Sequence, residues 1–125
     1  MILDTNALSA FVDGERAVGA RLSHETRVAI PVIVLGEFRY GIHGSRHRGA
    51  YEQWLADHLR DFEILTVREA TTVAYVHVRV ALKKLGRPIP ANDVWIAALA
   101  LQYGDAILSR DEHFDVVPDL DRQGW

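Results

Sequence analysis

Four acidic residues of this 125-residue sequence lie beside apolar segments, where an isolated carboxylate is costly. Two of them follow short apolar runs and two lie on helical sequence with apolar neighbours; they are Asp4, Asp111, Glu37 and Asp93. Each has an ordinary structural interpretation. Asp4 and Asp93 are placed to cap helices. Glu37 is placed to reach solvent and Asp111 to hold a turn. Gathered in one place, however, the four would bind a cation.

The elements that must position these acids alternate between short apolar strands and helices. Strands are predicted at residues 1–3, 28–30, 62–67 and 106–109. Helices are predicted at residues 7–11, 17–22, 32–42, 45–60, 68–85 and 91–103, with Gly86 and Gly104 ending the last two. This alternation is typical of a parallel sheet covered on both faces. We therefore predict one α/β domain over residues 1–125 with a central, mainly parallel sheet.

In an open α/β sheet, strand ends and helix N-termini meet at one edge, where the functional site lies. The four acids are therefore expected to lie near one another. Two carboxylates about 5 Å apart repel by roughly 3 kcal/mol at an effective dielectric constant of 20. Four would protonate or disrupt the fold unless a cation neutralised them. Because all these ligands are carboxylate oxygens, with no cysteine or histidine among them, we predict a site for Mg²⁺ or Mn²⁺, not Zn²⁺.

The composition limits the cellular compartments and the classes of binding partner that we expect. A net charge of −3 argues against a passive polyanion binder, but not against an enzyme that meets phosphates through metal ions. The absence of cysteine excludes disulfides and thiolate metal sites. No apolar run approaches the roughly 20 residues that cross a bilayer, and no targeting signature precedes the first strand. We expect a cytoplasmic protein without a membrane-bound segment.

Four segments of the sequence, MILDTNALS, VLGEFRYGI, IPANDVWIAA and ILSRDEHF, follow one another along the chain. Together they resemble the signature series of PIN-domain ribonucleases, in particular the VapC-like toxins of toxin–antitoxin pairs. The resemblance covers essentially the whole chain and implies a three-layer α/β/α PIN-like domain. Each motif alone is weak, and their common order and spacing carry the resemblance.

The resemblance also implies a site and a reaction. Carried over by position, the catalytic and metal-binding acids are Asp4, Glu37, Asp93 and Asp111, and the supporting polar residues are Asn6 and Ser109. One or two Mg²⁺ or Mn²⁺ ions would activate water to hydrolyse RNA phosphodiester bonds. Endonucleolytic cleavage would leave 5′-phosphate and 3′-hydroxyl ends, and no histidine is required as a general base.

The implied partners are an RNA substrate, a cognate antitoxin and a second copy of the chain. Arg110 and Arg39 are candidate RNA contacts. A further basic group is also a candidate but is better explained as a solvated helix face; it comprises Arg79, Lys83, Lys84 and Arg87. The homodimer surface is expected on apolar residues of the early helices and their surroundings, namely Val12, Val18, Leu22 and Ile42.

The remaining histidines and aromatic residues are given structural roles. His43 and His47 have the i, i+4 spacing of a metal pair, but Gly44 and Ser45 interrupt the helix, so no metal is expected there. His77 is expected to be semi-buried on an apolar helix face. Packing roles are expected for Trp54, Trp95 and Tyr40.

Two other functions remain as alternatives. A non-catalytic PIN-like module would bind protein or RNA without cutting it, and its stability would not respond to Mg²⁺. A phosphatase or phosphotransfer receiver on a similar sheet is disfavoured by two positions. The phosphatase pattern needs an acid where Asn6 stands, and the receiver needs a late lysine, whereas none follows Lys84.

Overall fold

The computed structural model describes residues 1–125 and contains one five-stranded sheet with the strand order β3-β2-β1-β4-β5. Every neighbouring pair of strands is parallel. The strands are β1 (Ile2–Leu3), β2 (Ala29–Pro31), β3 (Glu63–Leu65), β4 (Ile107–Leu108) and β5 (Arg122–Gln123). The α/β class with a central parallel sheet is thus confirmed, and β5 is a strand that the sequence analysis missed.

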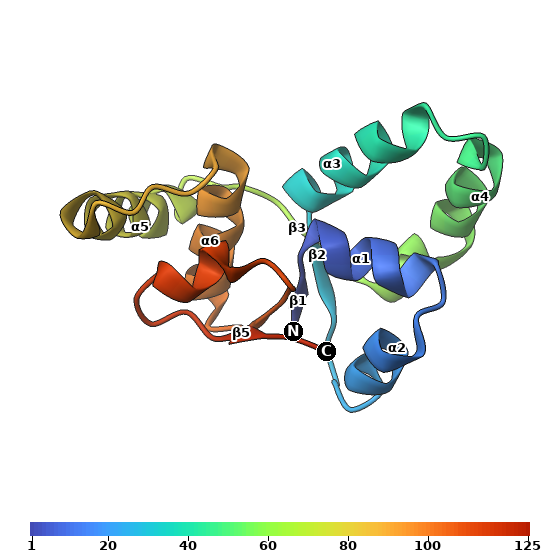
Figure 1. The fold of residues 1–125 in the computed structure, drawn as a ribbon, viewed down its shortest axis with the longest axis horizontal. Coiled ribbons are helices and arrows are strands. Elements are labelled where there is room, and N and C mark those ends of the chain that lie inside the picture. Colours follow the sequence, from blue (N-terminus) through green and yellow to red (C-terminus); the bar gives the residue numbers. More distant parts are fainter.

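Helices cover both faces of this sheet (Figure 1). One side carries α1 (Thr5–Val12), α2 (Arg16–Leu22), α3 (Val32–His43) and α4 (Arg48–His58). The other carries α5 (Thr71–Leu85) and α6 (Ala91–Tyr103). Two short 3-10 helices, η1 (Leu59–Asp61) and η2 (Glu112–Val116), complete the chain. No helix combines the length and apolar character that crossing a membrane requires.

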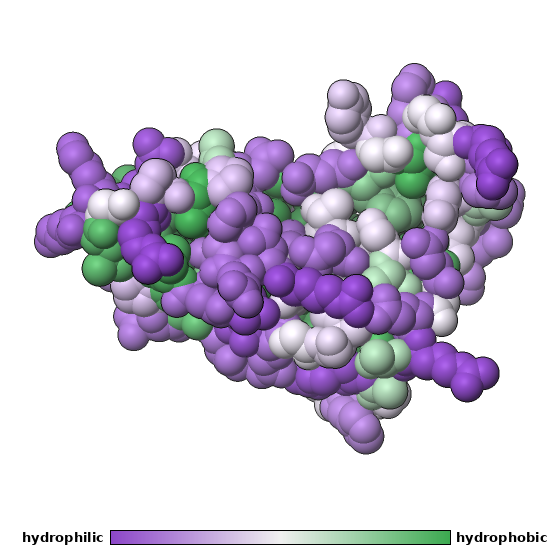
Figure 2. All heavy atoms as spheres, viewed as in Figure 1, coloured by the Kyte–Doolittle hydropathy of each residue, from purple (hydrophilic) through white to green (hydrophobic).

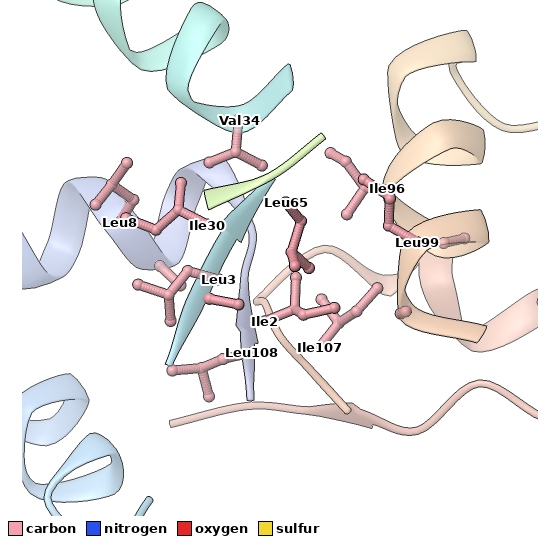
Figure 3. Packing of buried hydrophobic residues seen from close by; sticks show 14 of the residues in the cluster. Ile2, Leu3, Leu8, Ile30, Val34, Leu65, Ile96, Leu99, Ile107 and Leu108 are labelled. Carbon is pink, nitrogen blue, oxygen red and sulfur yellow. The ribbon is translucent and has the colours of Figure 1, made fainter. Parts of the chain in front are cut away.

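The core divides between the two faces because neighbouring residues of a strand point in opposite directions (Figure 3). Leu3 and its register partner Leu108 face the side of α1 and α3, whereas Ile2 and its partner Ile107 face α6. All four side chains are fully buried. With only two residues in each of these strands, this alternation anchors both helical layers on the sheet.

Helix α6 occupies the residues predicted for it, 91–103, and its middle is buried on every side. Buried residues of α6 include Ile96 and Leu99, which meet the sheet in Figure 3. Its outer flank packs on α5, where the rings of Tyr75 and Trp95 stack with centroids 3.9 Å apart. Gly104 ends α6 in the left-handed conformation that glycine adopts without strain.

Several expectations about exposure were wrong. His77 is exposed on α5 instead of semi-buried, and Tyr40 on α3 is 86% exposed instead of packed. Three of the four residues expected on the dimer surface, Val18, Leu22 and Ile42, belong to the buried core, and Val12 is partly buried. These residues are apolar because they pack between α1, α2, α3 and the sheet.

Apolar side chains are exposed elsewhere, on α5. They are Val73, Val76, Val80 and Leu85. Figure 2 shows apolar atoms gathered at the end of the molecule that α5 forms.

Some predicted bounds also differ from the structure. The strand predicted at 62–67 is the shorter β3, and the helix predicted at 68–85 begins only at Thr71. The predicted helix 45–60 is α4 followed by η1.

Candidate metal centre

Asp4 lies where the strand order of the sheet diverges. From β1 the sheet extends through β2 and β3 on one side and through β4 and β5 on the other. Ligands of open α/β sheets bind beyond the carboxyl ends of strands at such a point. Asp4 follows β1 directly, and its backbone N–H still donates to the carbonyl of Leu108 on β4 (3.1 Å). The position places a carboxylate at the carboxyl edge, between the two halves of the sheet.

The Asp4 side chain is held by polar residues instead of capping helix α1. It makes no capping hydrogen bond to that helix. Its Oδ2 accepts hydrogen bonds from Ser109 Oγ (2.7 Å) and from Asn6 Nδ2 (2.8 Å). Only 5% of Asp4 is exposed, and Ser109 is fully buried. The carboxylate is therefore fixed in orientation within the fold.

Asn6 and Ser109 also connect the residues after β1 to those after β4. Asn6 Nδ2 donates to Ser109 Oγ (3.1 Å), and Asn6 Oδ1 accepts from the backbone N–H of Arg110 (3.1 Å). Ser109 Oγ accepts from the backbone N–H of Asp111 (2.9 Å). These bonds link Asp4 to Asp111 although 107 positions separate them in the sequence. The two polar residues singled out from the sequence thus lie at the centre of the network.

Asp93 approaches from the other side, on the first turn of α6. The cap position of that helix is Pro90, and no side chain caps it. The Asp93 carboxylate is therefore free of a capping role, and its side chain is 14% exposed. It lies with Asp111 and His113, and one ligand atom of each is within 4.8 Å of the others. Buried helix α6 gives this carboxylate a rigid support.

His113 was missed in the sequence analysis, which expected oxygen ligands alone. Its Nδ1 is 3.3 Å from Asp93 Oδ2 and 3.2 Å from Asp111 Oδ1. The signal lay in the spacing of the segment DEHF. Asp111 caps η2 by accepting from the backbone N–H of His113 (2.9 Å), which turns the chain back toward the acid. Because such a turn brings the residue two positions after the acid back beside it, His113 could have been predicted as a ligand from this spacing.

Glu37 lies beside this centre, on α3. It is half-buried and accepts a hydrogen bond from Thr5 Oγ1 (3.0 Å), the residue after Asp4. Neither Glu37 nor Asp4 belongs to the close group of ligand atoms formed by Asp93, Asp111 and His113. The charges of Glu37 and Asp111 nevertheless act on Asp4. The structure thus brings together all four predicted acids, with Glu37 at the border.

The carboxylates of the site carry negative charge that no lysine or arginine of the protein neutralises. Burial raises the pKa of Asp4; the hydrogen bond from Ser109 opposes this rise, and the charges of Glu37 and Asp111 add to it. Burial raises the pKa of Asp93 to about 6, with contributions from Asp4 and Asp111, while His113 acts in the opposite direction. Such shifts are typical of functional sites.

No lysine or arginine lies within 4.0 Å of the carboxylate oxygens of the four acids. Carboxylates gathered without such a partner favour a bound cation. Asp93 and Asp111 offer oxygen, and His113 offers nitrogen. Divalent ions bind both kinds of donor. The residues present therefore fit a divalent metal ion.

The two arginines considered as RNA contacts have partners within the protein. Arg39 pairs with Glu52 on α4 (2.8 Å). The guanidinium of Arg110 pairs with Glu15 and lies over the ring of Trp125, 4.4 Å from its centroid. Neither guanidinium forms an ion pair with any of the four acids. Arg110 remains near them through its backbone and through a cleft that it lines together with Asp111 and His113.

Comparison with known proteins places the whole chain in one family. Residues 1–120 match the PIN domain. Ribonuclease VapC5 of Mycobacterium tuberculosis is 30% identical over 115 residues, covering 90% of this chain and 84% of that protein. Ribonuclease VapC1 of Haemophilus influenzae is 30% identical over 138 aligned positions, covering 99% and 96% respectively.

Solved structures share the fold over nearly the same length. VapBC2 from Rickettsia felis, bound to a DNA fragment from its promoter, has a TM-score of 0.89 and 25% identity, covering 99% of this chain and 97% of that one. FitAcB from Neisseria gonorrhoeae has a TM-score of 0.84 and 26% identity, with 97% and 94% covered. The chain therefore belongs to the PIN domain family, and its relatives within that family are VapC-like.

Proposed function

We propose that this protein is a divalent-metal-dependent endoribonuclease and the toxin of a toxin–antitoxin pair. The observation that carries the proposal is the acidic group at the divergence point of the sheet, without a lysine or arginine partner. The relatives named ribonuclease VapC support the choice of RNA as substrate. The similarity to VapC1 covers 99% of this chain and therefore includes the segments that contain all four acids.

In this proposal Asp4, Asp93 and Asp111 hold Mg²⁺ or Mn²⁺, and Glu37 acts from the border of the site. A bound ion would act as a Lewis acid toward a phosphodiester and would lower the pKa of water, so that water could ionise near neutral pH. The protein's contribution is to fix the acids. Ser109 and Asn6 orient Asp4, and the rigid helix α6 orients Asp93.

The RNA strand is expected to follow the cleft beside the acids. Asp111 and His113 line it together with Arg87 and Arg110. The two arginines offer charge to phosphates, although Arg110 must first exchange its contact with Glu15. On the opposite side, a shallow hollow contains Glu37 and the exposed ring of Tyr40, which is available to stack on an unpaired base. Arg39 remains a more distant candidate.

Cleavage of structured RNA with Mg²⁺ or Mn²⁺ tests the proposal directly. We expect new 5′-phosphate ends, no cleavage in EDTA, and losses of about 100-fold or more in Asp4→Asn and Asp93→Asn. Removing a residue that merely supports a metal ligand costs about 10- to 100-fold, so removing a ligand itself costs at least as much. Glu63→Gln is the matched control, since that acid has an arginine partner.

Activity that persists in EDTA, or in both asparagine variants, would rule out this proposal. Absence of cleavage together with a melting temperature that does not respond to Mg²⁺ or Mn²⁺ would favour the alternative, a non-catalytic PIN-like module. Both outcomes are read from the same purified preparations, so a folding defect in a variant is recognised from its melting curve.

The toxin assignment adds a cognate antitoxin and a homodimer. The VapBC structures with this fold support the first of these partners. The test is co-expression with the neighbouring open reading frame, which should restore growth and copurify with this chain. The homodimer requires a surface other than Val18, Leu22 and Ile42, because these residues are buried. Mass measurement in solution tests it.

A further inference from the structure

We propose that His113 Nδ1 is a direct ligand of the divalent ion and makes the centre prefer Mn²⁺ over Mg²⁺. The inference deepens the proposed metal centre and rests on that part of the proposed function. It starts from one observation: a ring nitrogen stands within the same close group of atoms as the carboxylates of Asp93 and Asp111. A site built for Mg²⁺ alone does not need this nitrogen as a ligand.

The distances suit ligation. Two ligand atoms bound at about 2.1 Å to one ion lie about 3.0 Å apart at a right angle and about 3.4 Å apart at a tetrahedral angle. His113 Nδ1 lies 3.3 Å from Asp93 Oδ2 and 3.2 Å from Asp111 Oδ1. Both distances fall within that range. The Asp93 and Asp111 oxygens of this group lie within 4.8 Å of each other, so the three ligand atoms are close enough to converge on one ion once the side chains adjust.

The local fold keeps the ring in this place. The backbone N–H of His113 donates to Asp111 Oδ1 (2.9 Å), which fixes the first turn of η2. The next residue, Phe114, is fully buried and anchors η2 to the core. The His113 side chain itself is 51% exposed, so it borders the cleft instead of filling the interior. A rigid turn thus presents the imidazole next to a rigid helix carrying Asp93.

Nitrogen ligation has a predictable consequence for metal choice. Mg²⁺ prefers oxygen ligands and retains its water reluctantly, whereas imidazole suits transition metals. Replacing an oxygen or water ligand by His113 therefore favours Mn²⁺ relative to Mg²⁺. The competing explanation makes His113 only a hydrogen-bonding partner of the two acids. In that case an incoming ion must displace the ring, and removing His113 would strengthen ion binding. The two explanations predict opposite signs.

Pulsed electron paramagnetic resonance of Mn²⁺ bound to the full-length protein tests the ligand directly. We expect a ¹⁴N coupling from the coordinated imidazole, present in the wild-type protein and absent in His113→Ala. His77→Ala is the matched control, because His77 is exposed on α5, outside the group of ligand atoms. That variant should keep the coupling. Absence of a nitrogen coupling in the wild-type protein would overturn the proposal.

Metal titration provides a second, independent measurement. His113→Ala should weaken Mn²⁺ binding by about 10-fold or more and Mg²⁺ binding by much less. His113→Asp restores an oxygen ligand, so it should retain ion binding while reducing the preference for Mn²⁺. Unchanged or tighter Mn²⁺ binding in His113→Ala would contradict direct ligation. Circular dichroism verifies that both variants are folded.

These measurements separate this inference from the proposed nuclease activity. A nitrogen-coordinated Mn²⁺ in a protein that does not cut RNA would support the ligand and refute the nuclease. Metal-dependent cleavage that requires Asp4 and Asp93, without a nitrogen coupling, would support the nuclease and refute the ligand.

Discussion

At the edge of the sheet where the strands begin, acidic side chains have a cationic partner within the protein. Arg27, just before β2, pairs with Glu63 at the start of β3 and with Asp105 just before β4. The N-terminal ammonium of Met1 is 4.0 Å from Asp105. Arg27 lowers the pKa of Glu63, and the pKa of Arg27 is itself raised by this partner. The charges of this edge are neutralised by the chain.

At the opposite edge, where the strands end, the acids have no such partner. The pKa values of Asp4 and Asp93 are raised above their ordinary range, mainly by burial. His113 is the only basic side chain within 4.0 Å of the carboxylates of Asp93 and Asp111. The charged form of a carboxylate is therefore stabilised at one edge, in Glu63, and destabilised at the other, in Asp4 and Asp93.

The difference separates a structural role from a functional one. A carboxylate whose charge is already paired contributes modestly to stability and needs nothing from outside. A carboxylate buried near others without a strong cation costs stability until an ion arrives. Experiments that exchange or remove charges at the two edges should therefore give effects of opposite sign.

The largest expected effect is stabilisation by metal. Mn²⁺ at 100 times its dissociation constant should raise the free energy of unfolding by about 2.7 kcal/mol, since only the folded protein gathers the acids. Thermal or urea unfolding with Mn²⁺ and with EDTA measures it. The gain should vanish in Asp93→Asn and persist in Glu63→Gln. Equal stabilisation of both variants would mean that the two edges do not differ.

Next in size is the effect of Asp93→Asn on the metal-free protein. Because the folded pKa of about 6 exceeds the ordinary value of 3.8, ionised Asp93 destabilises the fold. Wild-type stability should be fullest below about pH 4 and fall as pH rises through about 6. Asp93→Asn should remove the part of this fall that Asp93 causes, leaving the part due to the raised pKa of Asp4, and should gain on the order of 2 kcal/mol above pH 7.

Urea unfolding in EDTA at pH 4 and at pH 7.5 measures this gain. The two proteins should be similarly stable at the lower pH and differ at the higher one. A variant less stable than wild-type at pH 7.5 would show that the Asp93 carboxylate is not under strain in the absence of metal.

Ser109→Ala should cost roughly 1–3 kcal/mol of stability. The buried hydroxyl donates to Asp4 and accepts from Asn6 and from the backbone of Asp111, so its loss leaves polar groups without partners. Chemical denaturation in EDTA measures the cost. Ser23→Ala, which removes an exposed hydroxyl bonded to the carbonyl of Ala20 in the preceding helix α2, serves as the control and should change stability far less.

The smallest effect is expected at the neutralised edge. Arg27→Gln should lower the free energy of unfolding by less than about 1 kcal/mol, because its partners are partly exposed and exposed ion pairs contribute little. Metal affinity should be unchanged, as measured by Mn²⁺ titration. A large loss of metal binding would link the two edges and contradict their separation.

Much of the fold could be predicted because its signals are local. The all-apolar stretch of α6 and the terminating Gly104 gave bounds of 91–103 that the structure reproduces. Short apolar triplets indicated β1 and β4. The strand β5 was not predictable in this way, since Arg122 and Gln123 are polar and half-buried. Their strand conformation comes from pairing with β4 at the edge of the sheet.

Exposure was predicted less well because hydropathy does not say which face of an element has a neighbour. Val73 and Val80 on α5 are apolar and exposed, while Val18 on α2 is fully buried. Similarly, Tyr40 is an aromatic residue of the kind that often packs in a core. It lies two positions after the buried Phe38, however, and is exposed on the outer face of α3. Such differences depend on partners distant in sequence.

The sequence by itself determined that four acids could serve as ligands and near which elements they stand, because helix and strand signals are short in range. Only the tertiary structure decided that Asp4, Asp93 and Asp111 share one site, that Glu37 borders it, and that His113 joins it. Their separation along the chain hides these distances. The parallel sheet creates them, since it brings the ends of β1 and β4 together beside the first turn of α6.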